Sequence, residues 1–222
     1  MYDEGMKIIP REARRITYST EIRNLKQRLH LSDIQKAVVI GNILGDGHLE
    51  PNWSRTNYRL KIAHANAQAD YLLWQYEILK DWVLSKPAHY AKTASIRFRT
   101  ISHLELTELR NIFYKGVIKI IPKNIQGYLT PLVMAVWFMD DGNALKEGGI
   151  IRGYHLNTQS FTFAENEILA SVLKRNFDIA CSVVRNNGKY RLYIGAKSRG
   201  KFRSLIQNFV VPSLQYKIQS TM

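Results

Sequence analysis

Residues 39–47 of this 222-residue sequence read VIGNILGDG, and residues 134–142 read MAVWFMDDG. Each stretch closes a segment that is apolar on nearly every side, which predicts two interior helices, Asp33–Gly45 and Pro131–Asp140. An Asp-Gly pair follows each helix, and Gly47 suits the left-handed residue that often ends a helix. Two such stretches in one chain indicate an internal repeat.

Local signals place the starts of several helices. Ser32 and Gln35 form a predicted capping box, and Pro131 stands at the first position of the second interior helix. Two further capping boxes are predicted at Ser102–Glu105 and Thr162–Glu165. Between these starts, apolar and polar residues alternate, as is typical of half-buried strands.

The elements repeat in the same order after each interior helix. Strands are expected over 48–66, 90–100, 150–161 and 182–196, the last segment with an Asn-Gly hairpin turn. Helices are expected over 21–29, 67–83, 102–114, 162–176 and 199–209. Each half of the chain therefore reads helix-strand-strand-helix-strand-strand-helix.

The charge balance indicates a polyanionic partner. Lys and Arg exceed Asp and Glu by 32 − 18 = 14, and no acidic residue follows Asp178 although Lys and Arg continue to the end. The alternative is a basic surface that only aids solubility. That alternative fits a mixed-sign surface better than an acid-free stretch, so we favour nucleic acid as the partner.

Composition excludes several classes of protein. The single cysteine, Cys181, rules out an intrachain disulfide and a cysteine-based zinc site. No apolar run approaches the roughly 20 residues of a membrane span. The N-terminus contains Asp3 and Glu4 and has no apolar signal core. We therefore expect an intracellular protein of a prokaryotic cytoplasm or an organelle matrix, not a secreted one.

Asp46 and Asp141 stand at the ends of the two interior helices. A carboxylate there opposes the helix dipole, and a bound divalent cation would remove that cost. An ordinary Asp-Gly turn is the alternative for either site alone. However, Ala37, Gly41 and Gly45 form a smooth stripe that permits close parallel packing of the helices. Such packing would bring both acids together. Two close carboxylates can share divalent metal, as in metal-assisted phosphodiester hydrolysis.

The two quoted stretches, with LNTQSFTF at 156–163, resemble the LAGLIDADG homing endonucleases over roughly residues 35–218. The resemblance implies an α+β fold of two pseudo-symmetric αββαββα halves, 31–120 and 121–222, after an N-terminal extension, 1–30. The motif helices would join the halves, and each half would lay an antiparallel sheet into the DNA major groove. Val136 replaces a small residue of the family motif, which predicts looser helix packing there.

The resemblance also implies a metal site. Asp46 and Asp141 match the metal-binding acids of the family, and the backbone carbonyls of Gly45 and Asp140 match further metal contacts. The implied cofactor is Mg²⁺, with Mn²⁺ or Ca²⁺ also able to occupy the site, because hard oxygen ligands suit all three ions.

Three further side chains are implied near the reacting phosphates. Lys217 matches a family lysine beside the scissile phosphate, and Lys119 matches its partner, with Lys123 as the rival. Gln159 is expected on a strand that faces the site, where it would position water. By contrast, His64 is isolated in the sequence and is interpreted as a satisfied core or surface histidine rather than a ligand.

Basic residues alternate along the predicted strands. A β-ribbon can enter the major groove, where Arg and Lys hydrogen-bond to guanine, whereas a solvated sheet face is the alternative. With both motifs present, we expect DNA contact from Arg59, Lys61, Arg97, Arg99, Asn157, Thr158, Arg185, Lys189, Arg191 and Tyr193 and, near the final helix, from Lys197, Arg199 and Lys201.

Taken together, the sequence predicts a monomeric, site-specific double-strand DNA endonuclease. The family implies intron or intervening-sequence homing, a long asymmetric duplex target and short 3′ overhangs. One alternative is a splicing maturase on the same fold, whose partner is intron RNA and which need not keep both acids. A non-cleaving DNA-binding regulator is the other, and loss of one acid would have favoured it.

Overall fold

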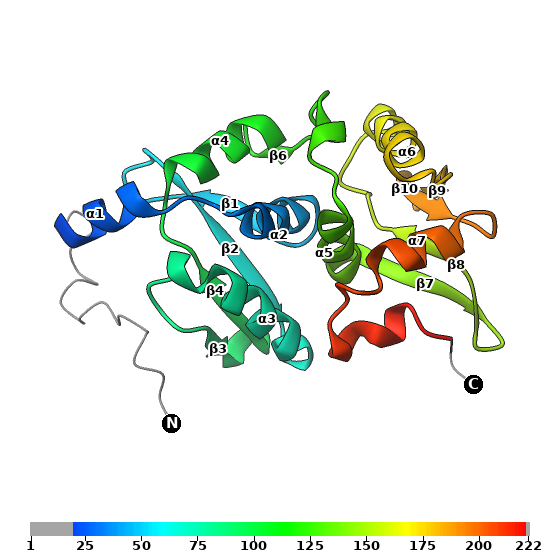
Figure 1. The fold of residues 1–222 in the computed structure, drawn as a ribbon, viewed down its shortest axis with the longest axis horizontal. Helices are drawn as coiled ribbons and strands as arrows, with labels where there is room; N and C mark the ends of the chain where they lie inside the picture. Colours follow the sequence, from blue (N-terminus) through cyan, green and yellow to red (C-terminus); the bar gives the residue numbers. More distant parts are fainter. Residues whose placement is uncertain (1–19, 221–222) are drawn as a thin grey trace.

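The structure, a computed structural model, describes residues 20–220, and these residues form two similar units side by side (Figure 1). The first unit comprises α2 (Asp33–Leu44), β1 (His48–Pro51), β2 (Tyr58–Ala65), α3 (Ala69–Leu79), β3 (Ala88–Tyr90), β4 (Ser95–Arg99) and α4 (Leu104–Phe113). The second comprises α5 (Pro131–Asp141), β7 (Gly142–Glu147), β8 (Ile150–Leu156), α6 (Phe163–Phe177), β9 (Ser182–Asn186), β10 (Lys189–Ile194) and α7 (Arg199–Ile206). The predicted repeat order and the α+β class are confirmed.

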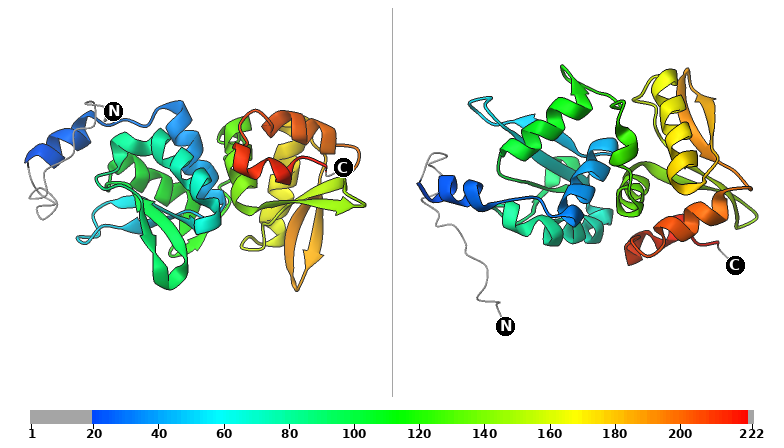
Figure 2. Two further views of the ribbon diagram at one scale, coloured as in Figure 1. Left: turned by 90° about the horizontal axis from the view of Figure 1, so that it is seen from below. Right: turned by 45° about the horizontal axis from the view of Figure 1, so that its top comes forward.

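Each unit contains one four-stranded antiparallel sheet. The strand order is β1-β2-β4-β3 in the first sheet and β7-β8-β10-β9 in the second. Helices α3 and α4 pack on one face of the first sheet, and α6 and α7 pack on one face of the second. Both sheets extend to the same side of the molecule, away from the motif helices (Figure 2).

The motif helices α2 and α5 lie against each other between the two sheets (Figure 1). A Cβ atom added at Gly41 would lie 2.5 Å from Cβ of Val136, and one added at Gly45 would lie 2.5 Å from Cβ of Asp140. The predicted close packing through glycine is therefore confirmed. The looser packing expected at Val136 is wrong, because its side chain occupies the space that Gly41 leaves free.

Two capping boxes are confirmed and one is wrong. Those that begin α2 and α6 have both reciprocal hydrogen bonds. At α4 the cap is His103, whose side chain accepts the Glu105 N–H. Ser102 instead accepts a hydrogen bond from Lys26 on α1, and Glu105 accepts one from Leu31. The helix thus begins one residue later than predicted, and the side chains of Ser102 and Glu105 bond to the N-terminal segment instead of to each other's backbone.

Gly47 does not adopt the left-handed conformation expected of it, since its φ lies outside the positive range. A Cβ atom at Gly47 would lie 2.7 Å from Cβ of Asn42. Glycine is required here because the chain passes close over the last turn of α2. At the β9–β10 hairpin, by contrast, Asn187 and Gly188 have φ values of 49° and 78°, as the predicted Asn-Gly turn requires.

Helix α1 (Thr20–Arg28) docks beside the first sheet. Its Ile22 is buried, and the Lys26 carbonyl accepts a hydrogen bond from Nε2 of His103 at 2.8 Å. Residues 1–19 of the predicted N-terminal extension lie outside the described residues. No helix within residues 20–220 has the length and apolar character needed to cross a bilayer.

The contact at Gly41 generates a stability prediction. Gly41→Ala is expected to lower the free energy of unfolding by roughly 1–3 kcal/mol, because the new methyl group meets the Val136 side chain. The matched control is Gly200→Ala in α7, where an added Cβ meets nothing within 4 Å. That change should raise stability by about 0.5–1 kcal/mol. Urea unfolding measures both, and equal effects of the two changes would contradict close packing at Gly41.

Candidate active site between the motif helices

The acids of the two motifs meet at one end of the packed helices. Asp141 is the last residue of α5 and is half-buried, whereas Asp46 lies in the turn after α2 and is exposed. Burial, together with the charge of the nearby Asp46 carboxylate, raises the pKa of Asp141 to about 6. Lys119 and Lys217 oppose this shift. The two acids lie close enough for their charges to interact, as the predicted helix packing requires.

Two lysines complete the cluster from opposite units. Lys119 lies on β6 (Ile118–Lys119), which pairs with β5 (Tyr114–Lys115), and its Nζ donates to the Gly45 carbonyl at 2.6 Å. Lys217 ends the 3₁₀ helix Pro212–Lys217, and its Nζ donates to the Met139 carbonyl at 2.6 Å. Burial lowers the pKa of both lysines, and the neighbouring acids oppose the shift.

The structure also separates Lys119 from its sequence rival. Lys123 is exposed and lines a surface depression with Gln126 and Glu167 of α6. Lys119 lies close enough to Asp141, Asp140 and Asp46 for their charges to affect its pKa. Lys119, and not Lys123, therefore belongs to the cluster.

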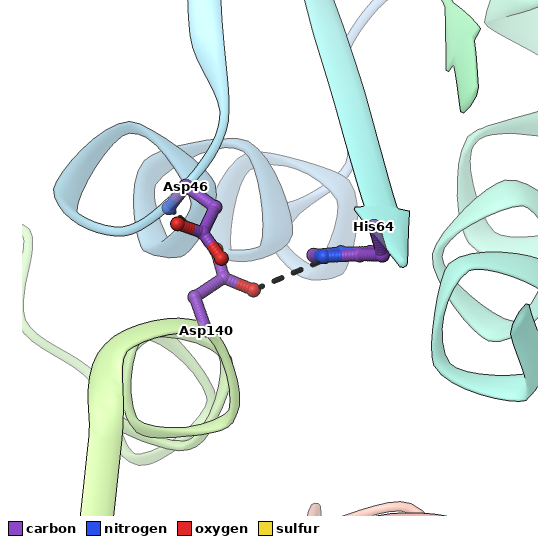
Figure 3. Close-up of side chains that lie close together, drawn as sticks. All are labelled: Asp46, His64 and Asp140. Atoms are coloured by element: carbon purple, nitrogen blue, oxygen red, sulfur yellow. Dashed lines mark hydrogen bonds and ion pairs between the residues drawn. The ribbon is translucent and has the colours of Figure 1, made fainter. Parts of the chain in front are cut away.

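Asp140 points away from the second unit and into the first (Figure 3). Its side chain is fully buried, which raises its pKa well above the usual range. One carboxylate oxygen accepts the Tyr71 hydroxyl at 2.7 Å, and the other accepts the backbone N–H of Asp46 at 3.1 Å. His64 Nε2 lies 3.9 Å from the first oxygen.

A chain of buried hydrogen bonds leads from α2 to His64. Asn42 Nδ2 lies 2.9 Å from the Val38 carbonyl, Gln75 Nε2 lies 3.1 Å from Asn42 Oδ1, and His64 Nε2 lies 2.9 Å from Gln75 Oε1. A backbone carbonyl can only accept, so every donor along the chain is fixed. His64 Nε2 must therefore carry a proton and donate it to Gln75. Burial lowers the pKa of His64, which favours the neutral ring.

This assignment bears on which groups can hold a metal. Asp46, His64 and Asp140 lie close enough to bind one ion together. However, His64 Nε2 carries a proton and cannot bind the ion, and each Asp140 oxygen already accepts a hydrogen bond, which leaves it fewer lone pairs for a metal. Within residues 20–220, the carboxylates of Asp46 and Asp141 accept no hydrogen bond. Their free oxygens are the ligand type that Mg²⁺ prefers.

The open face of the first sheet carries the predicted basic residues. Leu60 and Ile62 on β2 point into the core, so Arg59 and Lys61 point outward. Arg97 and Arg99 on β4 follow the same alternation. A groove of about 830 Å³ collects these four side chains, together with Lys26 of α1 and the 93% exposed Trp53.

Sequence reasoning missed Glu50 in this groove. Its carboxylate lies 2.8 Å from Arg59 and 3.8 Å from Lys61, directly across the β1–β2 ladder. One acid therefore fixes the position of Arg59 and partly neutralises the first strand pair. The spacing of His48 and Glu50 indicates that both lie on one face of a strand. The sequence alone does not show which cations lie opposite Glu50 on the neighbouring strand.

The second sheet presents a smaller basic set. Arg185 and Lys189 are exposed beside the β9–β10 turn, whereas Arg191 and Tyr193 are half-buried. The Arg191 Nε atom is buried and has no hydrogen-bond partner within residues 20–220. Asn157 lies at the acid cluster itself, because its backbone N–H donates to the Asp141 carbonyl at 3.0 Å.

The predictions for Gln159 and Thr158 are wrong, whereas Arg199 and Lys201 lie on the final helix as expected. Gln159 lies in the turn between β8 and α6, not on a strand. Thr158 is fully buried and bonds to Asn166 of α6. Arg199 and Lys201 lie on α7, whose Phe202 packs on the core side of β8, so this helix is on the covered face of the sheet.

The partners of these α7 residues agree with that placement. Lys201 pairs with Asp178, and the Arg199 guanidinium donates to the Arg152 carbonyl at 3.3 Å. Lys197 is exposed in the turn between β10 and α7. None of the three lies on the open strand face with the arginines, because the chain leaves the sheet at Gly195.

Two acids and two lysines at the shared end of α2 and α5, beside two antiparallel sheets with basic open faces, are the arrangement expected of a nuclease that binds duplex DNA. Comparison with known proteins agrees. The sequence matches the LAGLIDADG DNA endonuclease family over residues 36–202, so the chain belongs to this family. The resemblance drawn from the two motifs, and the class of function expected from it, a site-specific DNA endonuclease, are confirmed.

Three relatives illustrate the similarity. The probable intron-encoded endonuclease 1 of Wickerhamomyces canadensis is 30% identical over 203 residues, which cover 87% of each chain. The solved structure of the homing endonuclease I-WcaI bound to its DNA recognition sequence has a TM-score of 0.84 and 28% identity, over 92% of this chain and 95% of that chain. The cytochrome b mRNA maturase bI2 of Saccharomyces cerevisiae is 24% identical over 201 residues, 82% of this chain and 46% of the maturase.

The raised pKa of Asp141 predicts a pH-dependent stability difference. Its pKa is about 6 in the folded chain against about 3.8 unfolded, so the free energy of unfolding of the metal-free fold falls as the pH rises from about 3.8 to about 6. Asp141→Asn should therefore be more stable than wild type at pH 8 in EDTA, by on the order of 1–3 kcal/mol. At pH 3.5 the two should be equal. Urea unfolding at both pH values checks this, and a constant difference would contradict it.

Proposed function

We propose that this chain cleaves both strands of duplex DNA by metal-dependent phosphodiester hydrolysis, with Asp46 and Asp141 as the metal-binding acids. The observation that carries the proposal is their meeting at the shared end of α2 and α5, with free carboxylate oxygens. Each acid belongs to a different unit, which matches a reaction that must break two phosphodiester bonds.

The acids and the two lysines would have different roles in the reaction. A bound Mg²⁺, which Mn²⁺ or Ca²⁺ could replace, would lower the pKa of an attacking water and polarise the phosphate. Asp46 and Asp141 would hold the ion, with the carbonyls of Gly45 and Asp140 nearby. Lys119 and Lys217 would stabilise the negative charge that develops on the phosphates. Their present carbonyl partners would be exchanged for phosphate oxygens.

The two sheets would hold the DNA. Their open faces extend to one side, and the outward arginines of β4 are suited to guanine edges in the major groove. The similar solved enzyme is bound to its DNA recognition sequence, which supports a duplex partner. Two sheets with different side chains suit a long asymmetric target.

The family relationship supports the remaining details of the proposal. The intron-encoded relative supports homing into an intron or intervening sequence. Short 3′ overhangs and a location inside the cell stay part of the proposal as expectations from the sequence and the family resemblance. Both acids come from one chain, in proposed halves 31–120 and 121–222, so we propose that the enzyme acts as a monomer. Gln159 lies in the turn between β8 and α6, and we propose that it orients water from there.

One relative favours a second candidate function. The maturase bI2 aligns with 82% of this chain, so splicing of an intron RNA is the alternative reaction. A maturase need not keep both acids, whereas this chain does. Retention of Asp46 and Asp141 therefore favours cleavage, and a non-cleaving regulator is disfavoured for the same reason.

Cleavage should depend on both acids and on the metal. Asp46→Asn or Asp141→Asn is expected to abolish double-strand cleavage in Mg²⁺ while DNA affinity changes little, because the sheets are untouched. EDTA should abolish cleavage by wild type. The control is Asp178→Asn, an exposed acid paired with Lys174 and Lys201, which should cleave normally. Plasmid cleavage and gel-shift assays on a target selected from a randomised library decide the matter, and full cleavage by either motif variant would remove that acid from the site.

The two faces of the sheets should differ in DNA binding. If the open faces of the two sheets neutralise on the order of ten phosphates, log Kd should depend on the logarithm of the salt concentration with a slope near 9 in magnitude. Arg97→Ala or Arg99→Ala should relax preference at one base pair, at about 1–3 kcal/mol. Lys201→Ala, on the covered face, should leave both affinity and preference unchanged. Binding profiles over all single-base target variants test this, and a uniform loss for both arginine variants would assign them to the backbone.

A further inference from the structure

The buried chain of hydrogen bonds around Asp140 has no counterpart in the other motif. Asp140 precedes Asp141, as Gly45 precedes Asp46. A Cβ atom at Gly45 would lie 2.5 Å from Cβ and from Oδ2 of Asp140, so Gly45 makes room for the Asp140 carboxylate. The second motif thus places a side chain inside the first unit, whereas the first motif has no side chain to place in return.

Every hydrogen bond that fixes Asp140 comes from the first unit. Tyr71 of α3 donates its hydroxyl, and the Asp46 backbone donates its N–H. The Tyr71 ring also packs on His64, with ring centroids 4.8 Å apart. His64 in turn is held through Gln75 and Asn42 to the backbone of α2. A buried carboxylate is stable only when such donors are present.

We propose that Asp140 is a positioning residue: its carboxylate, anchored by the Tyr71 hydroxyl and the buried chain behind it, fixes the backbone of the Asp46 turn. This inference rests on the proposed function. Asp46 itself is exposed and its carboxylate has no hydrogen-bond partner within residues 20–220, so the N–H···Oδ2 bond is the contact that restrains this turn from the partner motif.

The restraint is one-sided, and this gives it a distinctive signature. Asp141 lies within α5, whose helical backbone fixes it without help from the first motif. Loosening Asp140 should therefore disturb Asp46 more than Asp141. If each acid serves mainly one strand, the two cuts should become unequal, whereas a general loss of stability would slow both equally.

The test is Tyr71→Phe, which removes one buried hydroxyl and leaves the packing. On a supercoiled plasmid carrying the target, the variant should make the first cut at about the wild-type rate and then accumulate nicked circles. The second cut should be slowed roughly tenfold or more, the factor expected for loss of a hydrogen bond to a charged group. The control is Tyr154→Phe, at another buried tyrosine, whose hydroxyl makes no hydrogen bond within residues 20–220. It should leave the two cuts balanced.

A second readout is independent of cleavage. In the metal-free wild type, the Asp46 amide proton should exchange slowly with solvent, because it is bonded to a buried carboxylate. Tyr71→Phe should speed that exchange several-fold, and so should Asp140→Asn, whose amide group can accept from only one of the two donors. The exchange of amides in the middle of α5 should not change.

The outcomes separate this inference from the proposed function. Unbalanced cuts with faster Asp46 exchange support both. A wild-type chain that fails to cleave in Mg²⁺ overturns the proposed function, and the amide exchange then still decides whether Asp140 restrains the turn. Unchanged Asp46 exchange in Tyr71→Phe and Asp140→Asn, or two cuts slowed equally by Tyr71→Phe, overturns the positioning role.

Discussion

The close approach of α2 and α5 is the constraint on which the rest of the structure depends. Gly41 and Gly45 on one helix face Val136 and Asp140 on the other, so the two backbones approach where a side chain would otherwise separate them. Each helix is followed in the chain by the sheet of its own unit, and each has a motif acid at its end. The same contact therefore joins the halves, aims both sheets to one side and brings the acids together.

Bringing those acids together opposes folding, and the surrounding residues show how the cost is limited. Burial raises the pKa of Asp140 and Asp141, and the nearby Asp46 carboxylate adds to both shifts. Lys119 and Lys217 offset part of the repulsion, although burial also lowers the pKa of each lysine. A divalent cation would relieve this repulsion, so the electrostatic conflict in the metal-free fold and the metal dependence that we propose for the activity would have the same origin.

Local patterns predicted much of this fold because they depend on neighbours in the chain. Apolar residues all round marked α2 and α5 as interior helices, and the strand alternation placed Arg97 and Arg99 on an open face. The failures have a tertiary cause. Ser102 lost its capping role to contacts with α1, and Gln159 fell in a turn because β8 ends at Leu156. Sequence spacing could not reveal either of these outcomes.

The buried chain around Asp140 shows the same limit within the site itself. Asn42, His64, Tyr71 and Gln75 lie on three different elements, and of the four only His64 was interpreted from the sequence, as an isolated histidine. Burial makes each of these side chains depend on the others, because leaving one polar group unpaired in this interior costs more free energy than a hydrogen bond normally contributes. A repeated motif therefore does not imply two equivalent sites. The pseudo-symmetric backbone supplies the acids twice, but the side chains that hold them differ, and the Asp46 turn depends on a residue of the other motif whereas Asp141 is held by its own helix.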